Sequence, residues 1–283
     1  MDHANETDVK FNNKRTRGVT KKPQIAKNRS RGIKEIVQYN KKGQPHGKEH
    51  TDLESTLVML ARTTVPITYN DWREVPEDFK HKMWDYVEKS FVVDHRSRKN
   101  IISSIGIKFR SFKHALTKYH IIPFMNDPEH LKNPPDLYNF IQKEHWDKFV
   151  ASRVSDEFQA LRKLQQERRD KHIYNHRLGR QGYVGLELKI KDELGSSDDD
   201  ELDRSELWKR ARQMTNGLFD PATQAIVDKI DELTKQSKLG LLDKIVGDQD
   251  ILTQSLGTPE HCGRVRGVGK FVTPTIPHSS SPS

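Results

Sequence analysis

The sequence predicts an all-α protein: a helical bundle with a long projecting helix, a disordered basic N-terminus and a Gly/Pro-rich C-terminal tail. Three observations support this fold class. Apolar residues recur every three or four positions in several segments, as they do along one face of a helix. No two segments show a convincing strand pattern. All four tryptophans lie among apolar residues at helical spacing, which favours burial over base stacking.

The composition allows a modest hydrophobic core that does not fill the whole chain. Of 283 residues, 33% are hydrophobic and 31% are charged, whereas globular domains average about 45–50% apolar and about 25% charged residues. This length accommodates one large domain or two small ones. The net charge of +9 favours nucleic acid or another anionic surface as the partner.

Residues 1–52 are predicted to form a disordered basic arm. From Lys10 to Lys34 the chain carries ten Lys and Arg residues and not one Asp or Glu. Mutual repulsion and the scarcity of apolar residues oppose compaction of this run. We expect it to follow a nucleic-acid backbone, with phosphate contacts from Lys14, Arg15, Arg17, Lys21 and Lys22. A solvated tail and a nuclear import signal are the alternative interpretations.

Residues 53–136 are predicted to form a helical DNA-binding module of the tryptophan-cluster type. An apolar stretch at 53–65 ends at Pro66, which cannot continue a helix. Asp71 and Glu74 have the spacing of a capped helix start, and a further helix follows to about residue 90. That helix has an apolar residue at every fourth position, namely Phe79, Met83, Val87 and Phe91.

The next helix, predicted over 98–119, combines an apolar stripe with a basic remainder that contains no acid. Such a helix can pack against a core and still offer cations to DNA, on or in the major groove. The candidate DNA contacts on it are Arg98, Lys99, Lys108, Arg110 and Lys113. The predicted core anchors of the bundle are Trp72, Trp84, Phe109 and Trp146.

The second half of the chain is predicted to be more loosely organised. Residues 137–192 hold a long helix, over about 137–175, whose thin apolar stripe suits a projecting helix or a coiled coil. An acidic linker at 193–204, a small helical region at 205–256 and a disordered tail at 257–283 follow.

No motif points to catalysis, a metal or a cofactor, and we expect none of the three. Cys262 is the one cysteine, so an intrachain disulfide is excluded. His172 and His176 are spaced like metal ligands on a helix but lack a third ligand nearby. The adjacent acids at 198–201 cannot hold the separated geometry of a two-metal site. No apolar run approaches the roughly 18 residues of a membrane span, and we expect a nuclear protein.

Several short motifs occur in an order that resembles a known family. They are RG at 31–32, DWREVPE at 71–77, KMW at 82–84, FRSFK at 109–113, NPP at 133–135, Trp146, YNHRLGRQGY at 174–183 and GTPEH at 257–261. Over roughly residues 30–270 the chain resembles the plant transposase family of the Ptta/En/Spm kind, which is found in CACTA-type DNA transposons.

This resemblance implies a plant nuclear protein related to the non-catalytic, DNA-binding partner that such elements encode, with strand transfer left to a separate protein. The expected partners are double-stranded DNA and either further copies of the chain, paired through its helices, or a partner transposase. Two alternatives stay open: a helical module for protein interaction or oligomerisation, and an active transposase.

Overall fold

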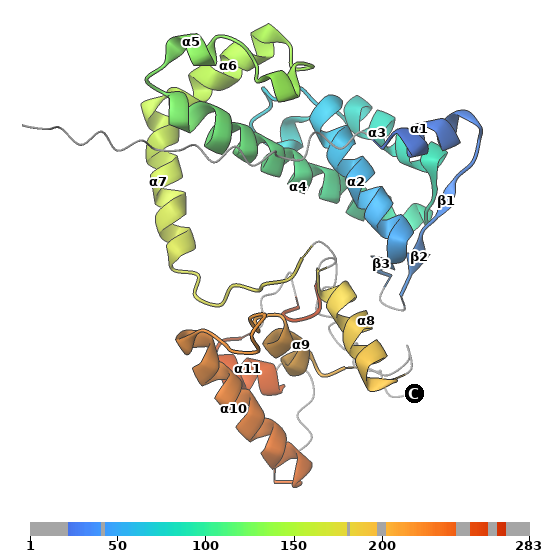
Figure 1. The fold of residues 1–283 in the computed structure, drawn as a ribbon, viewed down its shortest axis with the longest axis vertical. Coiled ribbons are helices and arrows are strands. Elements are labelled where there is room, and N and C mark those ends of the chain that lie inside the picture. Colours follow the sequence, from blue (N-terminus) through green and yellow to red (C-terminus); the bar gives the residue numbers. More distant parts are fainter. Residues whose placement is uncertain are drawn as a thin grey trace, which may run out of the picture.

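Helices form most of the regular structure, in two lobes joined by an extended segment (Figure 1). A computed structural model describes residues 22–40, 43–179, 182–196, 202–241, 250–259 and 265–269. These residues contain 11 α-helices and four strands of two residues each. The predicted all-α class is therefore confirmed.

The N-terminal lobe spans residues 22–170. Its α-helices are α1 (Pro23–Ser30), α2 (Gly47–Thr63), α3 (Glu77–Ser90), α4 (Arg98–Leu116), α5 (Pro128–Leu131), α6 (Lys143–Val154) and α7 (Asp156–Asp170). Its short helical turns are η1 (Trp72–Glu74), η2 (His95–Ser97), η3 (Thr117–Ile121), η4 (Ile122–Phe124) and η5 (Asp136–Tyr138). Strand β1 (Glu35–Ile36) pairs in parallel with β4 (Phe91–Val92), and β2 (Gln38–Tyr39) pairs antiparallel with β3 (Pro45–His46).

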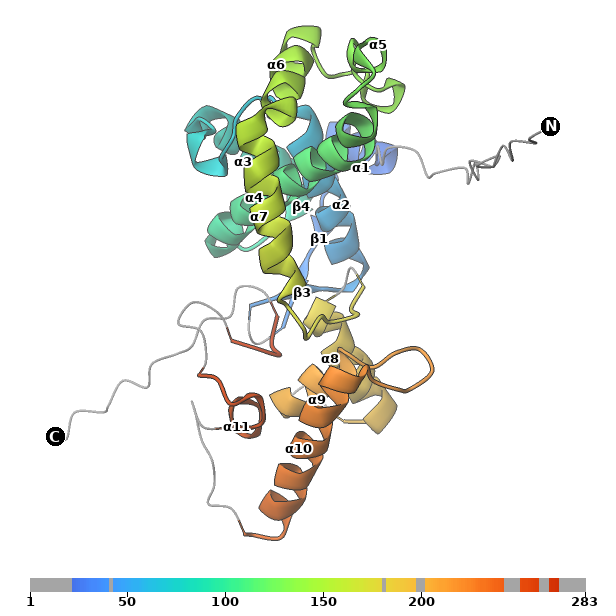
Figure 2. The ribbon, with the colours of Figure 1, turned by 90° about the vertical axis from the view of Figure 1, so that its left-hand side faces the viewer.

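The C-terminal lobe comprises the described residues from 182 to 269. Its helices are α8 (Gly182–Leu194), α9 (Arg204–Arg210), α10 (Pro221–Lys238) and α11 (Ile251–Leu256). Residues 171–179 run in extended form from the end of α7 to this lobe (Figure 2).

A first hydrophobic cluster holds α2, α3 and the first half of α4 together. The buried side chains face one another from all three helices, as their helical spacing requires. Among the best covered are Leu53 and Leu57 of α2, Met83 and Val87 of α3, and Ile105 of α4. Trp84 joins this cluster with 5% of its surface exposed, so the predicted stripe of α3 lies in the core.

A second cluster continues the core from the other half of α4. Phe112 and Leu116 of α4 pack there against Trp146 and Phe149 of α6. Trp146 is 1% exposed, and its indole Nε1 donates a hydrogen bond to the Leu131 carbonyl at 2.8 Å. The buried polar edge of this large ring is thereby satisfied.

The predicted long helix over 137–175 is wrong, because the chain forms α6 and α7 with a break at Ser155. This residue has an extended backbone, with φ −63° and ψ 145°. Its hydroxyl oxygen accepts a hydrogen bond from the Phe158 amide, 3.3 Å away, and Asp156 and Glu157 follow in the first turn. Serine before two acids starts a new helix, because it caps free amides and suits the helix dipole. Helix α7 also ends at Asp170, so His172 and His176 lie on the extended segment.

Other predicted boundaries also differ from the structure. The expected arm over 1–52 contains α1, β1 to β3 and the start of α2 within its described part, because Ile25 and Val37 are buried in the first cluster. Helix α8 extends into the predicted linker at 193–204. Within the predicted tail, Val268 is buried. Lys14, Arg15, Arg17, Lys21, Cys262 and the acids at 198–201 lie outside the described residues.

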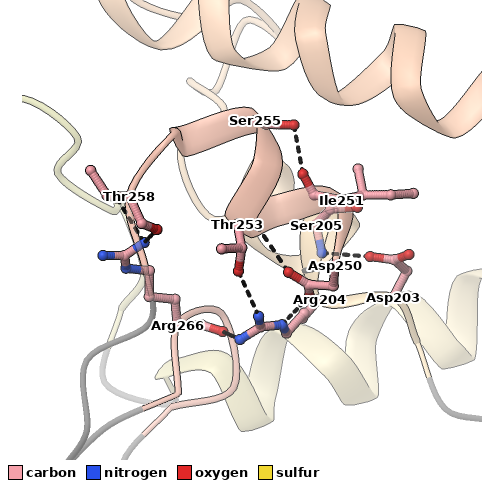
Figure 3. A network of polar contacts seen from close by, with 9 residues as sticks. All are labelled: Asp203, Arg204, Ser205, Asp250, Ile251, Thr253, Ser255, Thr258 and Arg266. Carbon is pink, nitrogen blue, oxygen red and sulfur yellow. Dashed lines mark hydrogen bonds and ion pairs between the residues drawn. The ribbon is translucent and has the colours of Figure 1, made fainter. Parts of the chain in front are cut away.

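One arginine ties three separate segments of the C-terminal lobe together (Figure 3). Arg204 of α9 forms an ion pair with Asp250, the residue that caps α11. It also donates hydrogen bonds to the Thr253 hydroxyl at 3.2 Å and to the Arg266 carbonyl at 3.4 Å. The Arg266 guanidinium in turn donates to the Thr258 carbonyl at 3.0 Å. The network fixes α9, α11 and the segment 265–269 against one another.

None of the described helices combines the length and apolar character that crossing a bilayer requires.

Replacing Trp84 by alanine should lower the free energy of unfolding by about 3–5 kcal/mol, since the change empties a buried site in the first cluster. Leu164→Ala is the control, because Leu164 is 43% exposed and its loss should cost within about 0.5 kcal/mol. Denaturant unfolding measures both. An unchanged unfolding midpoint for Trp84→Ala would show that this side chain does not anchor the core.

Replacing Asp250 by asparagine should destabilise the C-terminal lobe by about 1–3 kcal/mol, because the charged hydrogen bonds to Arg204 are lost while the amide oxygen can still cap α11. Burial alone would raise the pKa of the Asp250 carboxyl, but hydrogen bonds from Arg204 and Thr253 outweigh it and hold that pKa below its usual range. The ion pair therefore contributes its full stabilisation at pH values above the ordinary pKa of Asp. This contribution is lost as the pH falls through the lowered pKa of Asp250 in the folded protein.

Thermal unfolding of both proteins between about pH 7 and pH 2 tests this linkage. The stability difference should shrink in acid. A difference that stays constant over the whole range would contradict the role given to the Asp250 charge.

A cationic groove between α4 and α7

A groove with a volume of about 630 Å³ lies between the second half of α4 and the facing side of α7. Figure 2 shows α7 passing in front of α4. One wall carries Arg110, His114 and Lys118, which follow one another at four-residue steps on α4 and η3. The other wall carries Arg162 and Arg169 of α7. Residues four apart on a helix share a face, so both walls present cations to the same space.

The two walls contain cations that are not neutralised. Arg110 is exposed and Arg162 is half-buried, and neither forms an ion pair with any residue that the structure describes. Arg169 donates to the side-chain oxygen of Asn175 at 3.1 Å, and Lys118 lies 5.1 Å from the Tyr119 ring centroid. These neutral partners leave the positive charges available to an anion.

Asp71 is the one acid among the described residues that line the groove. Its two carboxylate oxygens accept hydrogen bonds from the Arg73 guanidinium at 2.9 and 3.0 Å. These bonds and one from the Arg73 amide hold the pKa of Asp71 well below its usual range. The carboxylate is therefore ionised but already paired, so the groove keeps a net positive charge.

The floor of the groove holds two further cations, Lys113 of α4 and Arg153 of α6, which are 6% and 8% exposed. The Lys113 ammonium donates to the carbonyls of Tyr69 and Asn70. The Arg153 guanidinium lies 4.4 Å from the Phe149 ring centroid and 4.5 Å from that of Phe158. Neither forms an ion pair with a carboxylate within the described ranges. Burial, with a smaller contribution from the charge of Arg153, lowers the pKa of Lys113 to about 8, although the charges of Glu74 and Asp71 act in the opposite direction.

A tryptophan and a glycine shape one end of the groove. Trp72 of η1 lies against α4, with its ring centroid 5.9 Å from that of Phe109. A Cβ atom on Gly106 would come within 2.7 Å of the indole ring, so only glycine lets the ring lie this close. Phe109 is buried beneath it.

The structure separates the cations predicted from the sequence. Arg110 lies in the groove, whereas Lys99 is exposed and Arg98 half-buried outside it. Lys108 forms an ion pair with Glu54 of α2, and Lys22 pairs with Asp52. Lys113 is turned into the groove floor. The charges of Lys108 and Lys22 are thus used within the protein.

The sequence prediction missed Lys118, Arg153, Arg162 and Arg169 as members of one site. A signal for the α7 wall exists, because Phe158, Leu161, Arg162, Gln165 and Arg169 occupy positions i, i+3, i+4, i+7 and i+11. That spacing places them on one face of a helix but does not say which element the face meets. Within the described residues, no three His, Cys, Asp or Glu side chains are grouped so that they could hold a metal ion.

The model of a family described as plant transposase (Ptta/En/Spm family) matches residues 142–275. The match covers α6, α7 and the whole C-terminal lobe. It therefore includes the α7 wall and Arg153 of the groove, whereas the α4 wall precedes it. No curated protein and no solved structure matches the chain.

Replacing Gly106 by alanine should destabilise the N-terminal lobe by about 1–2 kcal/mol, because the clash with Trp72 exceeds the gain in helix propensity. Gly179→Ala is the control, since no other atom lies within 4 Å of its Cβ position. Denaturant unfolding measures both variants. The penalty should vanish when Trp72 is replaced by leucine, and a penalty that persists there would contradict the proposed contact.

Proposed function

We propose that this chain is a non-catalytic protein of transposon origin that binds duplex DNA. The match of the plant transposase (Ptta/En/Spm) family model over residues 142–275 supports the transposon origin. The DNA-binding role rests above all on one observation: among the described residues that line the groove, four Lys and Arg side chains on the walls stand against one acid, Asp71, which is paired with Arg73.

The phosphate backbone of a duplex would lie across the outer edges of the groove. Arg110 and Lys118 on one edge and Arg162 and Arg169 on the other supply charges to both sides of it. Contacts of this kind give affinity and position rather than sequence readout. Since α7 passes in front of α4 (Figure 2), α4 is less suited to entering the major groove than the sequence suggested. Lys99 and the basic residues before 22 would add further phosphate contacts.

The non-catalytic part of the proposal is supported by the helical architecture. Metal-dependent strand transfer needs carboxylates held at fixed separations, and the sequence resemblance assigns that step to a separate protein. We also propose that this chain acts in the nucleus, beside a partner transposase that cuts and joins the DNA.

A second candidate function, self-association through α7, is favoured by one observation. Leu161 and Leu164 of this helix are 52% and 43% exposed, and a partly exposed apolar stripe can pair with another helix. Light scattering of the full chain would detect a dimer, and Leu164→Glu should then return it to a monomer.

The double variant Arg110→Ala/Arg162→Ala tests DNA binding through the groove. Removing two phosphate contacts should reduce the slope of log affinity against log salt by about 2, since each contact contributes about 0.9. Lys89→Ala/Lys148→Ala is the matched control, because both lysines are exposed and lie outside the groove. Fluorescence anisotropy with a duplex of transposon-end sequence gives the affinities, and the same mixtures with Mg²⁺ should contain uncut DNA.

An equal reduction of the slope by both variants would show that the groove has no special part in binding. Affinity that does not depend on salt, or cleavage of the duplex by the purified chain, would overturn the proposed function itself.

A further inference from the structure

The α4–α7 groove is large enough to hold a ligand between its two helices. Its volume of about 630 Å³ lies within the usual range of pockets for compact ligands, about 300–1,000 Å³. A DNA duplex, whose major groove alone is about 12 Å wide, can rest on the edges of such a space but cannot enter it. A single strand is thin enough to do so.

The floor is built for a negative charge. Lys113 and Arg153 both lie near the Phe149 ring, at 6.0 and 4.4 Å from its centroid, and both are buried. Two buried cations close together repel each other, and the negative charges of Glu74 and Asp71 offset this repulsion and the cost of burying Lys113 only in part. The carbonyls of Tyr69 and Asn70 solvate the Lys113 ammonium but carry no full charge. An anion in the groove would offset the unfavourable electrostatics of both groups.

The same floor argues against an acidic amphipathic helix from a protein partner. A helix bound in a groove inserts its apolar side chains at the bottom and leaves its charged residues at the edges. Here such a helix would press apolar side chains onto Lys113 and Arg153 and leave both charges buried and unpaired. A phosphate, or the polar edge of a base, meets these cations without that penalty.

Neutral amides between the cations suit the bases of such a strand. Gln165 and Gln166 of α7 line the groove and offer both donors and acceptors. Trp72 and Phe158 provide aromatic surface beside them. Cations that track a backbone and aromatic rings along the path are the combination that single-strand binders use.

We propose that the α4–α7 groove binds a single strand of nucleic acid, with a backbone phosphate or base edge held over Lys113 and Arg153. The inference rests on the proposed DNA binding and extends it: duplex regions contact the edges of the groove, and an unpaired strand enters it. An opened or overhanging end of the transposon DNA would supply such an unpaired strand.

The test compares an unpaired oligonucleotide of about 12 nucleotides, a length typical of single-strand sites, with the blunt duplex of the same sequence. Fluorescence anisotropy with the full chain should give an affinity for the strand about ten times that for the duplex. Leu161→Glu, inside the groove, should weaken strand binding about tenfold more than Leu164→Glu, one turn away and outside it. Both variants change the net charge equally and both positions are exposed, so neither threatens the fold.

Lys113→Met provides a second variant, which removes the floor charge and should reduce strand binding while leaving duplex binding within about twofold. Duplex binding without preference for the strand, or equal losses from Leu161→Glu and Leu164→Glu, would overturn this inference and leave the proposed function standing. Binding of neither probe would overturn both. Selective binding of an acidic amphipathic peptide that Leu161→Glu abolishes would assign the groove to a protein partner instead.

Discussion

Helix α4 is the structural element on which the rest of the N-terminal lobe depends, because it contributes buried side chains to two separate hydrophobic clusters. Its first half packs against α2 and α3 through Ile105. Its second half packs against α6 through Phe112 and Leu116. A helix that is buried along two such stretches can leave only one remaining strip of surface, and the groove forms along that strip.

The break at Ser155 supplies the other wall. An uninterrupted helix would continue along the axis of α6, whereas the extended backbone at Ser155 redirects the chain and brings α7 alongside α4. Arg153 lies at the inside of this bend, between Phe149 and Phe158. Local capping chemistry in a short stretch of sequence thus decides that the cations of α7 face those of α4.

Much of the helical architecture could be predicted from the sequence. The apolar stripes of α3 and α4 could be predicted because buried residues recur with the period of a helix. Asp71 caps η1 as its spacing indicates, since its carboxylate accepts a hydrogen bond from the Arg73 amide at 2.8 Å. The α6–α7 break was missed because good helix formers on both sides obscured a serine followed by two acids. That signal is present in the sequence but is weaker than the periodicity around it.

The groove itself could be predicted only in part. Arg110 was identified because an acid-free helix signals exposed charge. Lys108 and Lys113 have the same character in the sequence, yet their partners, Glu54 and the Tyr69 carbonyl, come from distant parts of the chain. Local sequence cannot show such partners. For the same reason Arg162 and Arg169 could not be predicted as part of the site, since their role depends on α7 lying beside α4.

Hydrogen–deuterium exchange of the full chain, with and without a saturating oligonucleotide, tests most directly whether the two facing helices form one nucleic-acid site. A strand bound between the helices should slow the exchange of backbone amides on both walls together, over 106–118 and over 156–170. Protection confined to the residues before 22 or to the C-terminal lobe, with both walls unchanged, would contradict a binding site between α4 and α7.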